Sequence, residues 1–248
     1  MVRSIRFIAS LITLVALWGV VAAVAHSSAL PSPAAVALFI VQDSLHGDMA
    51  FNVGMSLWRV FASFIVAMGI GTAIGLVLGR TRVLDEVVSP WVLVLLNTPA
   101  LVITALCYIW LGLNEFAAIV AVALNKIPNV AVLLREGVRS FDPALDDMAA
   151  VYRFSTWKRV RHVFLPQLAP FLTGAARSGL ALVWKIVLVV ELLGRPNGVG
   201  YAISYYFQLF DVRAVLGYSV VFSVVMLMIE LLVLQPLDDY ARRWRSAS

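Results

Sequence analysis

Residues 55–79 read MSLWRVFASFIVAMGIGTAIGLVLG, a continuous apolar run with one charged side chain, Arg59. A helix needs about 20 mostly apolar residues to cross the hydrocarbon of a bilayer, and this run is long enough. Five further runs have the same character, at residues 7–25, 88–111, 116–134, 168–193 and 214–236. A membrane barrel would instead show short alternating segments separated by turns. The sequence therefore predicts an all-α polytopic membrane protein with about six transmembrane helices.

The composition of the 248-residue chain agrees with this fold class. Hydrophobic residues make up 62%, charged residues 13%, and the mean hydropathy is +0.93, whereas soluble domains carry about 25% charged residues. These figures exclude disordered, collagenous and disulfide-stapled secreted chains, and the one cysteine, Cys107, is interpreted as a buried structural thiol. We expect residues 1–248 to form one transmembrane domain, with a first span at about 7–25 and core spans at about 55–236.

Small residues recur in the second run, where Gly71, Gly75 and Gly79 lie on one face of the expected helix. Such a face lets another backbone approach closely. Packing within the chain is favoured over a seam between two copies. No catalytic role is indicated by this pattern.

The basic residues predict the orientation in the membrane. With the N-terminus inside, most of the 19 Lys and Arg fall in cytoplasmic segments, and only Arg195 and Arg213 fall outside. This asymmetry satisfies the positive-inside rule, so both termini are expected in the cytoplasm, and the net charge of +5 does not indicate nucleic acid. The first run, with Ala23-Val24-Ala25 at its end, also imitates a secretory signal. We expect it to be retained, because it is longer than a signal core of about 7–15 residues.

The longest polar stretch is the 140–166 loop, SFDPALDDMAAVYRFSTWKRVRHVFLP. Asp142 followed by Pro143 is typical of a helix start, because the cap accepts a backbone N–H and proline has none to leave unpaired. Ser155 can cap a second helix that ends at Pro166. This helix would carry basic residues on one side and apolar residues on another, namely Lys158, Arg159 and Arg161 against Trp157, Val160, Val163 and Phe164. Two short helices are therefore predicted, with a break near Arg153 and Phe154.

This loop resembles the cytoplasmic EAA loop of permease subunits of binding-protein-dependent ABC importers. The family pattern is Glu-Ala-Ala, three residues, Gly, nine residues, Ile, any residue, Leu-Pro, and the spacing matches from Asp147 to Pro166. Asp147 and Met148 replace the usual Glu and Ala, and Arg153 replaces the glycine. Because a Cβ makes the left-handed conformation costly, the turn at Arg153 is expected to be built differently. The resemblance assigns ATPase coupling to Asp147, Met148, Ala149, Ala150, Arg153, Ser155, Trp157, Leu165 and Pro166.

The resemblance extends through WLGLNE at 110–115, GVRSFDP at 137–143 and LDDYARRW at 237–244, and it is greatest with the nitrate, sulfonate and taurine permease branch. It implies a MetI-like type I importer fold in the bacterial inner membrane. The implied partners are a second copy of the chain, two cytoplasmic ABC ATPase subunits and a periplasmic binding protein. It also implies a transport subunit rather than an enzyme. Since the chain has no G-x-x-x-x-G-K-[ST] motif, ATP and Mg belong to the ATPase, and no cofactor or metal is expected here.

Charges inside the apolar runs are the candidates for a substrate pathway, because such residues are expensive in a membrane and usually functional. Four qualify: Lys126, Lys185, Glu191 and Glu230. Pro128 is expected to kink the helix beside Lys126, and Trp184 precedes Lys185. Glu191 lies about 240° around the helix from Lys185, so these two are not expected to pair. The lysines either pair with Glu230 or Glu191 as structural ions, or line a pathway that favours an anion.

Two other readings of the charged residues stay open at this point. Arg195, Asp211 and Arg213 either meet the binding protein or accompany a belt of interfacial aromatics. The 140–166 loop could instead fold back on its own bundle or on lipid headgroups. The main competing function is an ion-coupled secondary transporter with Glu191 or Glu230 as the proton site. An intramembrane enzyme is disfavoured, because the sequence has no H-E-x-x-H, G-x-S-x-G or metal-ligand cluster.

Overall fold

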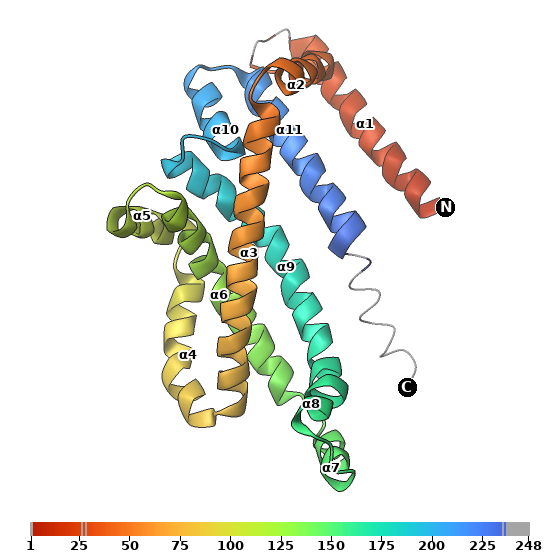
Figure 1. Ribbon diagram of the computed structural model, residues 1–248. Helices are drawn as coiled ribbons and strands as arrows, with labels where there is room; N and C mark the ends of the chain where they lie inside the picture. Colours follow the sequence, from red (N-terminus) through yellow and green to blue (C-terminus); the bar gives the residue numbers. More distant parts are fainter. Residues whose placement is uncertain (1, 26, 28, 235, 237–248) are drawn as a thin grey trace.

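The computed structural model describes residues 2–25, 27, 29–234 and 236, and every regular element in them is a helix (Figure 1). The expected all-α fold is confirmed; the resemblance at 237–244 lies outside the described residues. The α-helices are α1 (Val2–Ala25), α2 (Pro33–His46), α3 (Met49–Arg80), α4 (Arg82–Asn97), α5 (Ala100–Leu111), α6 (Glu115–Arg139), α7 (Pro143–Val151), α8 (Thr156–Arg159), α9 (Leu165–Gly194), α10 (Val199–Gln208) and α11 (Val212–Ile229). π-helical turns follow α8 at Val160–Phe164 and α11 at Glu230–Leu234.

The long helices run along one axis and give the molecule two ends (Figure 1). The end that holds α7 and α8 is called the loop end, and the end that holds α2 and α10 is called the far end. α3 and α6 lie side by side in the centre, and α9 packs against both of them. α1 contacts mainly α2 and stands apart from the central helices.

The glycine face of α3 is the contact with α6. A Cβ on Gly75 would lie 2.6 Å from the carbonyl oxygen of Ala131, and one on Gly71 would lie 2.6 Å from Cβ of Val130. Gly79 meets Val138 in the same way. The absence of side chains at these three positions lets the two helices approach closely, which confirms the prediction of packing within the chain.

Three helical segments among the described residues are long and apolar enough to cross a membrane by themselves: Met49–Arg80, Glu115–Arg139 and Val212–Leu232. α4 and α5 together make a fourth if the bent pair is one span. In α1 the apolar segment is the shorter Ala9–Ala25. α9 covers the expected span at 168–193 but carries Arg177, Lys185 and Glu191. Each expected run is therefore mainly helical in the described residues, and the runs differ in how well each one alone suits the hydrocarbon.

The expected continuous span at 88–111 is wrong as a single straight helix. α4 ends at Asn97, α5 begins at Ala100, and the two are bent by 100°. Thr98 is extended, with φ −77° and ψ 127°, because the ring of the following Pro99 disfavours the helical conformation at the residue before it. Pro128 has a milder effect than its place in a span suggests, since α6 runs unbroken from Glu115 to Arg139.

Candidate functional site

The 140–166 loop begins with the predicted caps. Oδ1 of Asp142 accepts a hydrogen bond from the Ala144 N–H at 2.9 Å, and Oγ of Ser155 accepts one from the Lys158 N–H at 3.4 Å. The expected end at Pro166 is wrong: α8 continues through the π-helical turn into α9. Pro166 is the second residue of α9 and directly follows the π-helical turn.

The turn between α7 and α8 is built as a glycine would build it, contrary to the expectation. Arg153 adopts φ +47°. The Phe154 N–H donates to the Ala149 carbonyl at 2.9 Å, and the Arg153 N–H donates to the Ala150 carbonyl at 3.0 Å. This pair of bonds is the Schellman arrangement that ends many helices. Arginine therefore accepts the left-handed conformation at a cost of about 1–2 kcal/mol.

The two short helices are held to each other and to the bundle. Arg159 Nη2 lies 3.0 Å from Asp146 Oδ1, which joins α8 to α7. Phe164 packs edge-on against Phe141 with ring centroids 5.1 Å apart, and the guanidinium of Arg80 lies 4.6 Å from the centre of the Phe164 ring. These contacts join the loop to the ends of α3, α6 and α9.

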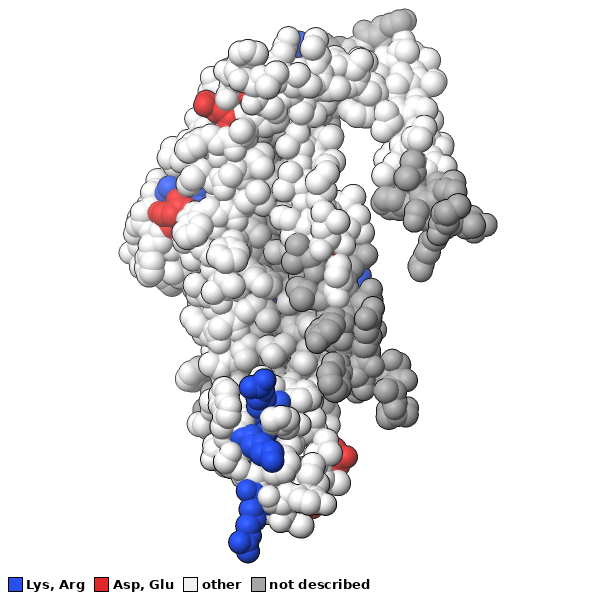
Figure 2. Space-filling model, turned by 45° about the vertical axis from the view of Figure 1, so that its right-hand side comes forward, with Lys and Arg blue, Asp and Glu red and all other residues white. Residues whose placement is uncertain are grey.

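The apolar side chains of the loop divide into two sets. Val163 is buried and Phe164 half-buried against the bundle, so the expectation that they share an apolar face with Trp157 is wrong. Trp157 is 70% exposed, and Val151 and Tyr152 are also exposed. Of the residues assigned to coupling, Ala149 is buried and Met148 half-buried, while the others are exposed: Asp147, Ala150, Arg153, Ser155, Trp157, Leu165 and Pro166. Lys and Arg gather at this end on the face in Figure 2.

Lys126 lies in the interior, against α9. Lys126 is only 2% exposed. Within the described part of the chain it makes no hydrogen bond or ion pair. Gly179 leaves it room, because a Cβ there would lie 2.8 Å from Cε of Lys126. Lys185 is exposed on α9, with Nζ 5.6 Å from the centre of the Trp184 ring, and it too has no carboxylate partner among the described residues. The alternative in which these lysines pair with Glu191 or Glu230 is therefore wrong for this structure.

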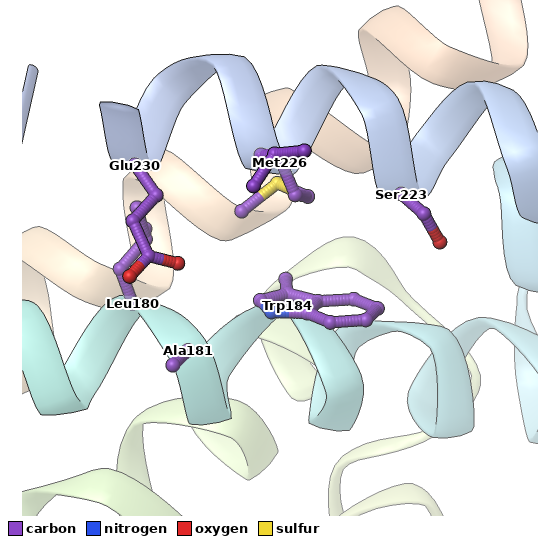
Figure 3. A pocket seen from close by; sticks show the side chains of 7 residues that line it. Leu180, Ala181, Trp184, Ser223, Met226 and Glu230 are labelled. Carbon is purple, nitrogen blue, oxygen red and sulfur yellow. The ribbon is translucent and has the colours of Figure 1, made fainter. Parts of the chain in front are cut away.

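Trp184 and Glu230 line a small pocket between α9 and α11 (Figure 3). The Trp184 ring packs edge-on against Phe222, with centroids 5.9 Å apart. Figure 3 shows the Glu230 side chain extending from the α11 side toward α9, above Leu180. The pocket encloses about 190 Å³, and Met226 and Ser223 complete its wall. It is too small for most organic solutes but large enough for a small ion with water.

Glu191 lies at the far end and pairs with Arg59, a residue that sequence reasoning did not select. Arg59 Nη1 lies 2.7 Å from Glu191 Oε1, and both side chains are almost completely buried. Arg59 Nε also bonds Glu115 at 2.7 Å, and the remaining donors reach Glu115 and Asn197. Arg59 qualified by the same criterion as the four charges that were selected, because it lies inside an apolar run.

The same cluster caps the start of α10. The N–H groups of Gly198, Val199 and Gly200 each donate at 2.8 Å to a side chain from α3 or α9, respectively Asn52 Oδ1, Ser56 Oγ and Glu191 Oε2. The first N–H groups of a helix have no partner within the helix, so these side chains supply what α10 lacks. We call Asn52, Ser56, Arg59, Glu115, Glu191 and Asn197 the far-end cluster. It joins α3, α6, α9 and α10.

The outer charges lie around this cluster. Arg195 Nη2 lies 2.8 Å from Glu115 Oε2. Asp211 caps α11 by accepting hydrogen bonds from the N–H groups of Arg213 and Ala214. Tyr205 and Tyr206 form a T-shaped pair on α10. Across the described residues, His, Cys, Asp and Glu form no group of three or more that could hold a metal.

Comparison with known proteins agrees with this architecture. The family described as "Binding-protein-dependent transport system inner membrane component" matches residues 68–237. The putative aliphatic sulfonates transport permease protein SsuC of Bacillus subtilis is 28% identical over 86% of this chain and 78% of its own length. The nitrate import permease protein NrtB of Synechococcus elongatus is 23% identical over 76% of this chain and 71% of its own. An inward-facing structure of the MetNI methionine ABC transporter superposes with a TM-score of 0.68, at 18% identity, over 81% of this chain and 98% of that one.

Proposed function

Since the chain belongs to the family of inner-membrane components of binding-protein-dependent transport systems, it is a permease subunit of an ABC importer, and we propose that its 140–166 loop couples it to a cytoplasmic ATPase. Two copies of the chain would form the pathway with two ATPase subunits, which hold ATP and Mg. Both termini would lie in the cytoplasm. A periplasmic binding protein would deliver the solute at the far end. Membership in this family also disfavours the ion-coupled transporter.

The observation that carries the coupling role is the exposed apolar patch on a loop that packs against the bundle. Trp157, Tyr152 and Val151 are exposed at the loop end, beside Lys158 and other basic residues. Exposed apolar groups rimmed by charges are typical of protein interfaces, where the apolar centre supplies affinity and the charges set register. Phe164 packs against Phe141 and Arg80 and so joins the loop to the bundle, which means that a partner bound to the patch can move α6 and α9.

The test is co-purification with the cognate ABC ATPase, and coupled transport. Trp157→Ala should reduce ATPase recovery and transport at least tenfold, because an interface tryptophan contributes about 2 kcal/mol or more. Trp58→Ala removes an equally large, exposed tryptophan from α3, away from the loop, and should leave recovery unchanged. If Trp157→Ala supports normal recovery and normal coupled transport, the docking role is refuted.

We also propose that the solute is a small anion such as nitrate, a sulfonate or taurine. The support is the absence of a carboxylate partner for the ammonium groups of Lys126 and Lys185 among the described residues, since unpaired cations in a low-dielectric region attract anions. The relatives named for sulfonate and nitrate transport agree. Lys185→Glu should abolish anion uptake, and Lys185→Arg should preserve much of it. Unchanged uptake by an assembled Lys185→Glu transporter would contradict the pathway role.

A further inference from the structure

We infer that the loop end of each chain holds one anionic phospholipid, with its phosphate among Arg80, Arg82 and Arg139 and an acyl chain in a groove between α4 and α6. The inference rests on two adjoining hollows and on the charges that line them. It concerns a surface of the single chain and does not depend on the transported solute.

The first hollow has a charged lining. It measures about 500 Å³ and is formed where α3 ends, α4 begins and α6 ends. Its wall consists of Gly79, Arg80, Arg82, Asp85, Glu86 and Arg139. Two of the membrane-crossing segments end at arginines of this wall, Met49–Arg80 and Glu115–Arg139. The hollow therefore lies at the depth where a lipid headgroup meets the hydrocarbon.

The second hollow has a mainly apolar lining and shares Glu86 with the first. It measures about 510 Å³ and lies between α4 and α6. Apart from Glu86, Ser89 and Arg135, its wall is apolar: Pro90, Val92, Leu93, Leu96 and Val132. From Glu86 to Leu96 it follows α4 for roughly 15 Å at 1.5 Å per residue. The charged hollow suits a lipid headgroup, and the apolar groove that continues from it along α4 suits an acyl chain.

The arginines keep donors free for a phosphate. Within the described residues, Arg82 uses only Nε, at 3.2 Å, for Glu86, and Arg139 uses only Nη2, at 2.6 Å, for Asp85. Arg80 stacks on Phe164 and makes no bond to a carboxylate in the part of the chain that the structure describes. Guanidinium groups bind phosphate with paired N–H donors. Three elements thus present unused N–H groups to one hollow.

The charge balance also suits an anion. The nearby carboxylates are Asp85, Glu86 and Glu136, and the nearby guanidiniums are Arg80, Arg82, Arg135 and Arg139. Asp85 is held by Arg135 at 2.9 Å and by Arg139, and Glu136 is held by Arg135 at 2.9 Å. One positive charge is left over, and a phosphatidylglycerol headgroup carries one negative charge. Basic pockets between membrane helices are known to bind such headgroups.

The experiment uses the full-length chain purified in mild detergent and titrated with phosphatidylglycerol or phosphatidylethanolamine of identical acyl chains, with bound lipid counted by native mass spectrometry. The wild type should prefer phosphatidylglycerol. Arg80→Gln/Arg82→Gln should remove the preference, at roughly fivefold per arginine. Arg82→Gln alone should reduce the preference for phosphatidylglycerol about fivefold. The Arg82 side chain is 91% exposed, so this substitution should affect folding little. Arg213→Gln, at the far end, should change nothing.

A second variant tests the apolar half. Leu93→Trp fills the groove and should weaken both lipids alike, without changing the preference between them. Equal binding of the two lipids by the wild type would overturn the inference, and so would a preference that survives in the double variant. Loss of ATPase recovery in the double variant with an unchanged lipid preference would show that the hollow docks a protein instead. Saturation by inorganic phosphate at the same concentration as the lipid would show that the groove contributes nothing.

Discussion

Removing Arg59 should unfold the protein at a much lower temperature than removing an exposed arginine. All five N–H donors of its guanidinium are used, by Glu115, Glu191 and Asn197. In Arg59→Leu the carboxylate of Glu191, which is 1% exposed, loses its cation and stays buried. Stranding one partner of a buried ion pair costs about 3–5 kcal/mol. At about 2–4 °C per kcal/mol, the midpoint should fall by roughly 6–20 °C.

The chain carries its own probe for this measurement. Cys107 is the single cysteine in the sequence and is buried in α5. The neighbouring Tyr108 donates a hydrogen bond to the Val190 carbonyl at 2.9 Å, next to the far-end cluster. A thiol-reactive fluorophore should therefore label the protein only as this region opens, and a temperature ramp reports the midpoint directly.

The control is Arg213→Leu, which removes an exposed guanidinium whose one carboxylate partner in the described part of the chain is Asp211, at 3.4 Å. Exposed pairs of this kind contribute about 0–1 kcal/mol. The double variant Arg59→Leu/Glu191→Gln should recover part of the loss, because it removes the stranded charge. If Arg59→Leu lowers the midpoint no more than Arg213→Leu, or if the double variant shows no recovery, the cluster does not stabilise the fold as argued.

Two further substitutions test the backbone. Arg153→Gly should stabilise the turn between α7 and α8 by about 0.5–1 kcal/mol. Glycine accepts φ +47° without strain, and the gain is reduced because glycine loses more conformational freedom on folding. Slower proteolysis at this turn would show the gain, and Arg153→Ala, which keeps a Cβ, should show none. Gly75→Ala should lower the midpoint of unfolding by several degrees, because its Cβ would clash with the Ala131 carbonyl at 2.6 Å. Gly69→Ala, on the same helix with open space around it, should not, and equal midpoints for the two variants would contradict the packing argument.

The helices and their central contact could be predicted because their signals are local. Apolar runs mark the helices, and the spacing of Gly71, Gly75 and Gly79 marks the face that meets α6. The bend between α4 and α5 also has a local signal, because the residue before Pro99 is disfavoured in a helix. The length and hydropathy of residues 88–111 nevertheless led to the prediction of one continuous span. The turn at Arg153 shows the limit of local rules, since the hydrogen bonds of Phe154 hold arginine where glycine is usual.

The ion pairs could not be predicted, because their partners are far apart in the sequence. Helical periodicity can exclude a Lys185–Glu191 pair on one helix, but it says nothing of a partner on another helix. Glu191 pairs with Arg59, which lies 132 residues away in the sequence, and Glu115, the other partner of Arg59, lies 56 residues from it. These pairs depend on the register between α3, α6 and α9, which is set by helix packing, in part at the glycine face between α3 and α6, and not by any pattern around the charges.

The placement of these charges bears on how the molecule moves. The far-end cluster ties α3, α6, α9 and α10 by buried bonds, and opening it would cost several kcal/mol. At the loop end the Asp85 carboxylate pairs with Arg135 and Arg139, but these side chains, like those of Arg159 and Asp146, are more exposed than Arg59 and Glu191, and more exposed pairs are weaker. A conformational change driven from the 140–166 loop should therefore leave the far-end cluster intact and move these helices as one body. Lys185 is exposed on the surface of this group of helices. Its environment would then change as the group moves, while α9 itself keeps its conformation.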